Sequence, residues 1–319
     1  MSMTQIRTTP PRMLKESYGR RLLRNMARHP VLYFMALPVF LYFVVFHFLP
    51  MYGLIISFQR YVPAKGVFES AWVGLKHFKA FFGDMFFWRL LRNTFLLNFY
   101  DLVFGFPMPI LFALLLNEVS SRTFKRLTQT ITYMPHFISL VVVCGLIFTF
   151  TRSTGPIAQI VASATGQDAF NLLGRAENFR AIYVATNIWQ GFGWGSIIYF
   201  AALSTIDPSL YEAAVIDGAK RFKQVIHITL PSIAPTIVIL LILRIGQIMS
   251  VGFEKIILLY SPSTYETADV ISSYVYRRGL VELNYSFGTA VGLFNSLINF
   301  VLIIGANAFS RKVNETSLW

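Results

Sequence analysis

The chain has 319 residues, of which 55% are hydrophobic, 16% aromatic and only 13% charged, a composition too apolar for an ordinary soluble protein. The net charge of +13 could suggest a nucleic-acid partner, but much of it lies in tails and loops beside apolar segments, where Lys and Arg orient a membrane protein, so we expect no nucleic acid. The single cysteine, Cys144, excludes an intrachain disulfide and a thiolate metal cluster.

A basic segment at 1–30 precedes a long uncharged stretch. It carries seven Lys or Arg residues against one acid, Glu16, which predicts a cytoplasmic tail. The uncharged stretch 31–59 is far longer than the apolar core of a cleaved signal peptide. We therefore expect it to remain as the first membrane span, at about 31–57, which exceeds the roughly 20 residues that a bilayer requires.

Five further apolar stretches predict five more spans, at about 93–117, 128–150, 181–206, 231–253 and 287–308. The segments between them predicted to lie outside are 60–92, 152–180 and 254–282. The first of these is rich in aromatic residues, as is typical of a segment at a membrane interface. An even number of spans puts both termini on one side, and a modest excess of Lys and Arg identifies that side as the cytoplasm.

The predicted fold class is thus an all-α polytopic membrane protein with six transmembrane helices. Its predicted organisation is a basic cytoplasmic tail at 1–30, a transmembrane domain at 31–310 and a short cytoplasmic tail at 311–319. We find no convincing tandem repeat and no segment composed like a soluble catalytic domain.

A polar and charged segment, 207–231, separates the fourth and fifth predicted spans. Asp207 is placed to cap a helix, because its carboxylate can accept hydrogen bonds from the free backbone N–H groups of the first turn. Two short helices are predicted, at 208–217 and 219–227, joined where Gly218 can adopt a left-handed conformation. The result is a helix-turn-helix elbow, here called the elbow, suited to lying in a groove of a partner.

Seven residues of the elbow match a spaced pattern of Glu-Ala-Ala, three residues, Gly, nine residues, Ile, one residue and Leu-Pro. They are Glu212, Ala213, Ala214, Gly218, Ile228, Leu230 and Pro231. In this pattern the sequence resembles the membrane-spanning subunits of bacterial ABC importers. The resemblance implies that the elbow is a cytoplasmic coupling helix that inserts into an ATPase subunit, with Glu212 as its anchoring charge. The alternative is an ordinary interfacial helix pair that connects two spans.

Residues for catalysis or cofactor binding are not evident in the sequence. The five histidines are scattered without metal-ligand spacing, and no nucleophile stands with a base, so we predict no catalytic and no metal site. A glycine-rich loop ending in Lys-Ser or Lys-Thr, which would hold ATP phosphates, is also lacking. We predict a transport subunit that is not an enzyme, binds no cofactor itself and depends on ATP hydrolysis elsewhere.

Two ionisable residues, Asp101 and Arg244, fall inside predicted spans. Placing such a group at membrane depth costs about 2.5 to 3.5 kcal/mol on insertion scales, so it requires a partner or a role. We expect the two side chains to face the interior, either as a mutual ion pair or as walls of a wet substrate pathway.

Further candidates for the substrate pathway are polar or aromatic residues of the last three spans. In the fourth span they are Asn187, Trp189, Gln190 and Trp194, interleaved with glycines that permit close helix approach. Apolar rings and hydrogen-bonding groups together suit a sugar. An interfacial tryptophan belt with helix-packing glycines is the alternative. Weaker candidates are Gln247, Asn295 and Asn299.

The six-span layout, the elbow and the aromatic external segment look like a carbohydrate-type ABC importer permease of the type I fold, in particular one for complex oligosaccharides, including alginate and other uronic-acid chains. The resemblance implies a bacterial inner-membrane location and several partners. These are a second related permease subunit, two ATPase subunits that bind ATP and Mg, and a periplasmic or extracellular solute-binding protein. Alternatives are a permease for an amino acid or phosphate, a membrane-embedded enzyme and a channel.

Overall fold

The computed structural model describes residue 25 and residues 27–314. Most of the predicted basic tail at 1–30, and the last five residues of the predicted tail at 311–319, lie outside the described residues. The chain forms two compact units, residues 1–54 and 55–319, and each is described by itself.

The first unit is helical throughout its described part from Pro30 onward. Helix α2 (Pro30–Phe43) continues through a π-helical turn (Val44–Phe48) into α3 (Leu49–Met51) and a 3-10 turn (Tyr52–Phe58), whose last four residues belong to the second unit. Together they make an apolar stretch of 29 residues, Pro30–Phe58, which is long enough to cross a bilayer. Pro38 lies inside α2 without ending it. The structure thus contains the helix predicted at 31–57.

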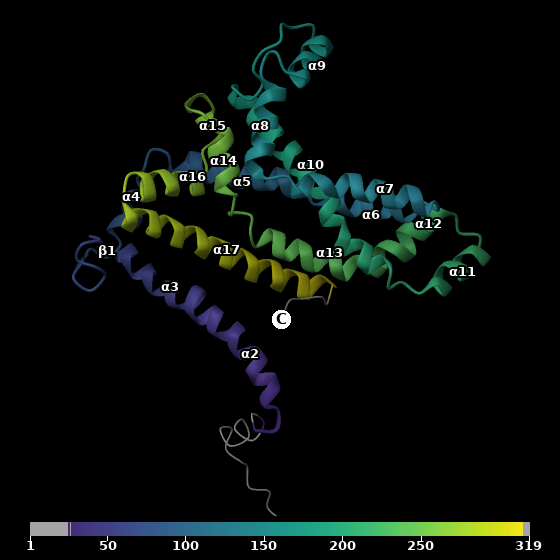
Figure 1. The fold of residues 1–319 in the computed structure, drawn as a ribbon, viewed down its shortest axis with the longest axis horizontal. Coiled ribbons are helices and arrows are strands. Elements are labelled where there is room, and N and C mark those ends of the chain that lie inside the picture. The colour runs from purple at the N-terminus through teal and green to yellow at the C-terminus, as the bar shows by residue number, and fades with distance from the viewer. Residues whose placement is uncertain (1–24, 26, 315–319) are drawn as a thin grey trace, which may run out of the picture. The chain divides into compact units, whose positions relative to one another are not determined.

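In its described residues the second unit is mainly helical and contains one short antiparallel pair of strands, β1 (Gln59–Arg60) and β2 (Ala71–Trp72). Its helices, shown in Figure 1, are α4 (Lys76–Phe82), α5 (Phe87–Tyr100), α6 (Pro107–Asn117), α7 (Arg122–Tyr133), α8 (Leu140–Thr151), α9 (Pro156–Thr165), α10 (Ala176–Leu203), α11 (Pro208–Ile216), α12 (Arg221–Gln224), α13 (Leu230–Ile245), α14 (Phe253–Leu259), α15 (Tyr265–Ala268), α16 (Ile271–Val275) and α17 (Tyr285–Asn314).

Five stretches of helix in the described residues are long and apolar enough to cross a membrane: Pro30–Phe58, Phe87–Asn117, Leu140–Thr165, Arg221–Ile245 and Tyr285–Lys312. Helix α10, which covers the predicted fourth span up to Leu203, is 28 residues long but is not among these apolar stretches. Its Asn, Gln and Gly residues lower its hydropathy.

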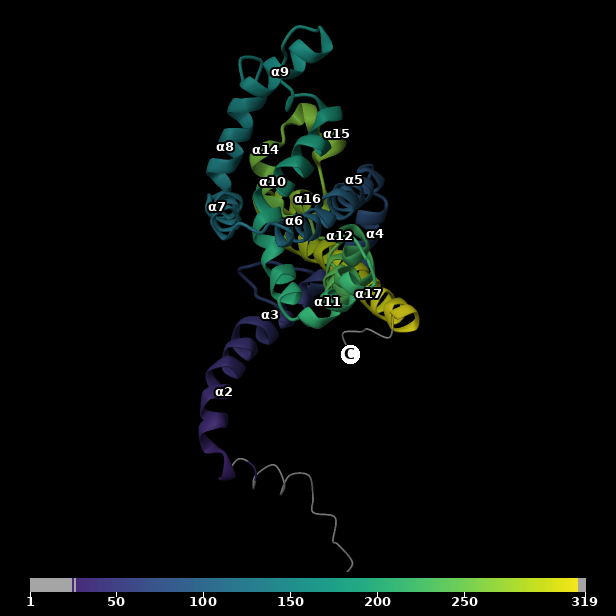
Figure 2. The same cartoon turned by 90° about the vertical axis from the view of Figure 1, so that its right-hand side faces the viewer.

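The third predicted span is not one straight helix. Helix α7 ends at Tyr133, a 3-10 turn follows at Met134–Phe137, and α8 begins at Leu140 in a different direction (Figures 1 and 2). Pro135 lies in this turn and cannot donate the backbone hydrogen bond that a continuous helix requires. The prediction of one continuous helix at 128–150 is therefore wrong, because this segment contains the end of α7, a turn and most of α8.

The fifth predicted span also differs in its bounds. Helix α12, a π-helical turn (Val225–Thr229) and α13 run on without a break, so the helix begins inside the elbow and ends at Ile245, before the predicted end at 253. Pro231 lies inside this continuous helix, directly after the π-helical turn, and does not interrupt it. The segment predicted as an external loop at 254–282 contains α14, α15 and α16.

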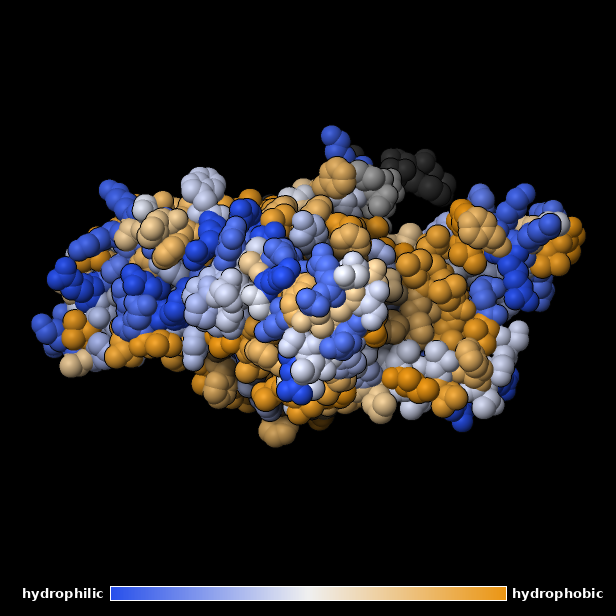
Figure 3. Space-filling model, turned by 90° about the horizontal axis from the view of Figure 1, so that it is seen from above, coloured by the Kyte–Doolittle hydropathy of each residue, from blue (hydrophilic) through white to orange (hydrophobic). Residues whose placement is uncertain are grey.

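Helix α10 lies at the centre of the second unit and contacts α5, α6, α7 and α13, while α13 also lies beside α17. Buried hydrophobic side chains form three clusters. The first joins α8, α10 and α14, the second joins α4, α5, α16 and α17, and the third joins α6, α10 and α13. Many other large hydrophobic side chains stay exposed, as Figure 3 shows for one face, which is expected where lipid or a membrane partner covers the surface.

Candidate functional site

A cavity of about 970 Å³ opens between the second, fourth and fifth predicted spans. Its wall combines apolar side chains with a few polar groups, as is typical of small-molecule sites. Among its lining residues are Asp101, Gly105, Asn187, Trp194, Arg244 and Gln247. Among the lining residues, Asp101 and Arg244 are the charged ones. We call this space the central cavity.

Asp101 and Arg244 form an ion pair in the wall of the central cavity. Asp101 is buried and begins a π-helical turn (Asp101–Gly105) between α5 and α6, an irregularity that often marks functional positions. Gly105 leaves room for the carboxylate, since a Cβ there would lie 3.1 Å from Asp101 Oδ1. The two residues therefore pair with each other and also line a cavity, and their part in a substrate pathway stays a prediction.

Lys255 of α14 joins this pair through Asn187, a contact that the sequence did not reveal. Lys255 Nζ donates to Asn187 Oδ1 at 2.6 Å and to Thr186 Oγ1 at 2.9 Å. Asn187 Nδ2 in turn donates to Asp101 Oδ1 at 3.4 Å. The result is a chain of contacts from Lys255 through Asn187 and Asp101 to Arg244.

The surroundings of Lys255 are largely apolar, and the residue is only 5% exposed. The titratable groups around its amine are Cys144 of α8 and Tyr183 of α10, whose ring centroid lies 5.0 Å from Nζ. Burial lowers the pKa of the Lys255 amine to about 8, because desolvation disfavours the charged form. Lys255 was not identified from the sequence because the residue was assigned to an external loop. The apolar residues that follow it, beginning with Ile256, were the signal that this lysine lies in a buried segment.

The aromatic and polar patch predicted on the fourth span faces two cavities. Asn187 and Trp194 line the central cavity, as does Gln247. Trp189 instead lines a second, apolar cavity of about 630 Å³ between α8, α9 and α10. Gln190 lines neither cavity and donates to the Ile138 carbonyl at 3.4 Å. The structure therefore does not bring these four side chains together.

The ring of Trp194 is held by a neighbouring aromatic side chain. It stacks on His136 with ring centroids 4.7 Å apart and planes almost parallel. Phe137 also packs against it edge to face, with ring centroids 5.3 Å apart, and 43% of the surface of Trp194 stays exposed. Gly193, one residue before it, allows α10 to approach α7, since a Cβ there would lie 2.2 Å from the Thr132 carbonyl oxygen.

The two asparagines of the last span lie outside the central cavity lining. Asn299 accepts from the Met249 backbone N–H at 3.0 Å and donates to Ser250 Oγ at 2.8 Å, so it ties α17 to the turn after α13. Asn295 has its Oδ1 buried without a hydrogen-bond partner among the described residues. Their geometry indicates packing within the helix bundle.

The elbow has the predicted local structure at two points, the start of its first helix and the turn between its two helices. Asp207 Oδ1 accepts from the Ser209 backbone N–H at 2.9 Å and so caps α11. Gly218 adopts the left-handed conformation, with φ +75°. Glu212 and Ala213 are exposed, as are the apolar Ile216 and Phe222, whereas Ala214, Ile228 and Leu230 are half-buried and Pro231 is exposed. An exposed surface that mixes apolar and charged groups on a projecting elbow is suited to docking.

A hydrogen bond that the sequence did not reveal holds the two arms of the elbow together. Tyr211 Oη on α11 lies 3.0 Å from Thr229 Oγ1, which is buried in the π-helical turn before α13. Gln224 Nε2 donates to the Ala219 carbonyl at 2.9 Å and closes the turn from the other side. These contacts fix α11 to the base of the fifth span, so that the elbow and the span can move as one body.

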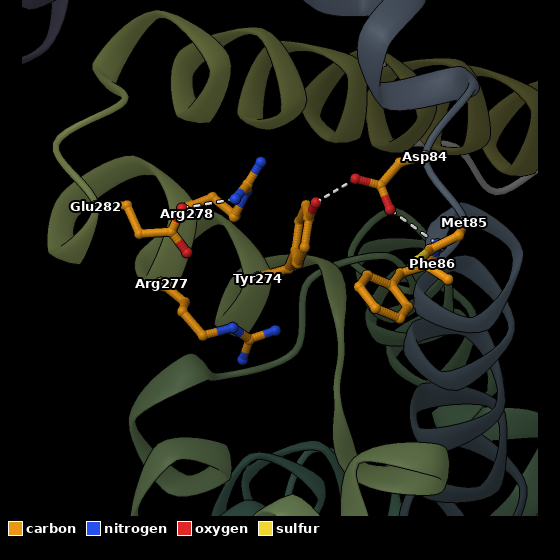
Figure 4. A pocket seen from close by; sticks show the side chains of 7 residues that line it. All are labelled: Asp84, Met85, Phe86, Tyr274, Arg277, Arg278 and Glu282. Atoms are coloured by element: carbon orange, nitrogen blue, oxygen red, sulfur yellow. Dashed lines mark hydrogen bonds and ion pairs between the residues drawn. The ribbon is translucent and has the colours of Figure 1, made fainter.

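A network centred on Asp269 organises the helices at 254–282. Asp269 is fully buried, accepts from Arg277 Nη2 at 2.8 Å and from Ser273 Oγ at 2.8 Å, and pairs with Arg89 of α5 at 3.4 Å. Next to it is a small cavity of about 360 Å³, where Tyr274 Oη donates to Asp84 Oδ2 at 2.5 Å (Figure 4). The lining shown in Figure 4 contains two cations and two anions: Arg278 pairs with Glu282, Arg277 pairs with Asp269 outside the lining, and Asp84 accepts from Tyr274. These bonds indicate a structural role.

Known proteins match this chain over nearly its whole length. A family model described as "Binding-protein-dependent transport system inner membrane component" matches residues 105–315. Protein LplB of Bacillus subtilis is 44% identical over 308 residues, 96% of each chain. The polygalacturonan/rhamnogalacturonan transport system permease protein YteP of the same organism is 42% identical over 307 residues, again 96% of each chain.

Solved structures give the same result. The chain is similar to a chain of a bacterial ABC transporter involved in the import of the acidic polysaccharide alginate, with a TM-score of 0.84 and 46% identity, covering 92% of this chain and 99% of that one. A second structure, of a bacterial alginate ABC transporter with an alginate pentasaccharide-bound periplasmic protein, gives a TM-score of 0.85 and 45% identity, with 93% and 100% covered.

Proposed function

Since this chain belongs to the family of binding-protein-dependent transport system inner membrane components, we propose that it is the permease through which an ABC importer moves acidic oligosaccharides across the inner membrane. The observation that carries the proposal is the full-length similarity to permeases whose names specify alginate or polygalacturonan, both of which are polymers of uronic acids. An arginine in the wall of the central cavity agrees with a substrate that bears carboxylates.

The central cavity supplies the chemistry that a sugar requires. Trp194, which lines the cavity and is 43% exposed, can offer its indole to the apolar face of a sugar ring. Asn187 and Gln247 can exchange hydrogen bonds with hydroxyl groups, and Arg244 can bind a carboxylate through its forked N–H donors. The cavity would be one half of the pathway, completed by a second related permease subunit.

The elbow would connect the pathway to ATP. In the proposed orientation it lies in the cytoplasm, as do both termini, and docks into a groove of one of two partner ATPase subunits that bind ATP and Mg. Closure of the ATPase pair would move the groove. The elbow, which is tied to the start of α13 by the hydrogen bond from Tyr211 to Thr229, would then move α13 with it as a rigid body. A periplasmic or extracellular solute-binding protein would deliver the oligosaccharide to the opposite side.

Reconstitution tests this function. The chain, its second permease subunit and the ATPases are incorporated into proteoliposomes that contain ATP and Mg, and the solute-binding protein is added outside. We expect ATP-dependent uptake of oligogalacturonate or oligomannuronate, and none without ATP. Uptake of amino acids or phosphate in place of these sugars, or passive sugar flux without ATP, would contradict the proposal and favour another permease class or a channel.

A further inference from the structure

The charges around the central cavity do not balance. Two cations, Arg244 and Lys255, share a single carboxylate, Asp101, through the chain of contacts described above. Among the described residues Lys255 forms no ion pair, although it is almost fully buried. A buried cation without an anion is costly, so a cluster with one surplus positive charge favours the arrival of a negative group.

Lys255 fixes the orientation of Asn187. A lysine ammonium can only donate hydrogen bonds, so the amide oxygen of Asn187 must face it. The amide nitrogen then points to Asp101 and acts as a donor to that carboxylate. Asp101 therefore receives hydrogen bonds from both Asn187 and Arg244, and its charge is well satisfied without the full donor capacity of the guanidinium.

Arg244 retains donors for a second carboxylate. Its side chain is 44% exposed and belongs to the wall of the central cavity. A guanidinium carries five N–H donors, and the ion pair with Asp101 is made through Nη2. A ligand carboxylate that enters the cavity can therefore bind Arg244 while Asp101 keeps its other donor, Asn187.

We propose that Arg244 is a specificity-determining residue that binds the carboxylate of a uronic-acid unit during transit, and that Lys255 is the positioning residue behind it. The proposal rests on the proposed function and names the part of the substrate that the permease itself recognises. Trp194 in the same wall supplies the stacking surface for the ring that carries the carboxylate. Lys255 acts through Asn187 and through its charge, since it does not line the cavity itself.

The test measures the preference for an acidic sugar over a neutral one. The complete complex of both permease subunits and both ATPases is placed in lipid nanodiscs without the solute-binding protein, so that selection by that protein does not contribute. Binding of a trigalacturonate and of the same trisaccharide with its carboxyl groups reduced to alcohols is measured by calorimetry. For the wild-type complex we expect the acidic sugar to bind about 10-fold or more tightly, as charge-assisted hydrogen bonds predict, and the preference to fall with salt.

The variants separate binding from structure. Arg244→Gln should lose nearly all of the preference for the acidic sugar over the neutral one. Asp101→Asn combined with Arg244→Gln, which leaves no buried carboxylate alone, should lose it as well. Lys255→Gln should lose a part of the preference and Lys255→Arg should keep it. Arg175→Gln removes a half-exposed cation that does not line the central cavity and serves as the control.

Several results would overturn the inference. Equal binding of the two sugars by the wild-type complex, no measurable binding of the acidic sugar at millimolar concentration, or an unchanged preference in both Arg244 variants would refute the subsite. If Lys255→Arg lost as much of the preference for the acidic sugar as Lys255→Gln does, the role of the Lys255 charge would be refuted. The proposed function fails separately, when wild-type proteoliposomes take up no uronic-acid oligosaccharide.

Discussion

Gly218 offers a clean test of the elbow, because substitution there strains the backbone without creating a clash. Its φ is +75°, and a Cβ built at this position would meet nothing within 4 Å. The effect of Gly218→Val therefore comes from the left-handed conformation itself, which costs about 1 to 3 kcal/mol for a residue other than glycine. A strain of about 1 to 2 kcal/mol lowers the population of the native turn about 5- to 30-fold.

The assay is the number of ATP molecules hydrolysed for each oligosaccharide imported by reconstituted complexes. We expect Gly218→Val to raise this ratio several-fold while the complex still assembles, because the spans are untouched and only the turn is disturbed. Gly218→Asn should behave nearly as the wild type, since asparagine tolerates the left-handed conformation. Gly166→Val places the same strain at an exposed turn away from the elbow, where φ is +69°, and is the matched control.

An unchanged ratio in Gly218→Val would refute the reasoning, as would an equal rise in Gly166→Val. The first result would show that the elbow does not transmit the movement of the ATPase. The second would show that the ratio responds to general strain in the chain.

Three further predictions follow from other contacts. Thr229→Val removes the hydrogen bond to Tyr211 at a cost of about 1 kcal/mol, and each of Thr229→Val and Tyr211→Phe should raise the number of ATP molecules hydrolysed for each sugar imported. Because both substitutions remove the same bond, the double variant should raise this ratio by less than the sum of the two single effects. Gly193→Ala should lower the melting temperature of the complex, because its Cβ would lie 2.2 Å from a carbonyl oxygen, whereas Gly191→Ala, with nothing within 4 Å, should not. Raising the pH from 7 to 9 should weaken the preference for the acidic trisaccharide, because Lys255, with a pKa of about 8, loses its charge on this rise; Lys255→Arg should remove that part of the pH dependence.

The sequence predicted those parts of the molecule that depend on local physics. Long apolar runs predict spans because a bilayer demands them, and Asp207 and Gly218 predict the start and the turn of the elbow because capping and a left-handed turn require such residues. The fold class and the resemblance to carbohydrate ABC importer permeases are confirmed by the full-length similarity. The sidedness of the termini and the roles of the site residues stay predictions.

The parts that failed depend on tertiary contacts or on competition between local signals. Pro135 lies at the break in the third span even though the hydropathy around it is uninterrupted, whereas Pro231, directly after a π-helical turn, lies inside a helix that continues through it. The link from Lys255 to Asn187 joins residues 68 positions apart, and the bond from Tyr211 to Thr229 joins two helices across a turn. No periodicity or composition in a single sequence reports such pairs.

The central claim is that the elbow docks into an ATPase subunit. The most direct measurement places a photo-crosslinking amino acid at Ile216, which is 86% exposed on the elbow, and compares it with Ile160 of α9, which is 66% exposed. In the assembled complex we expect Ile216 to crosslink to the ATPase subunit and Ile160 not to do so. A crosslink from Ile216 to the solute-binding protein, or none to the ATPase in complexes that hydrolyse ATP, would contradict the account.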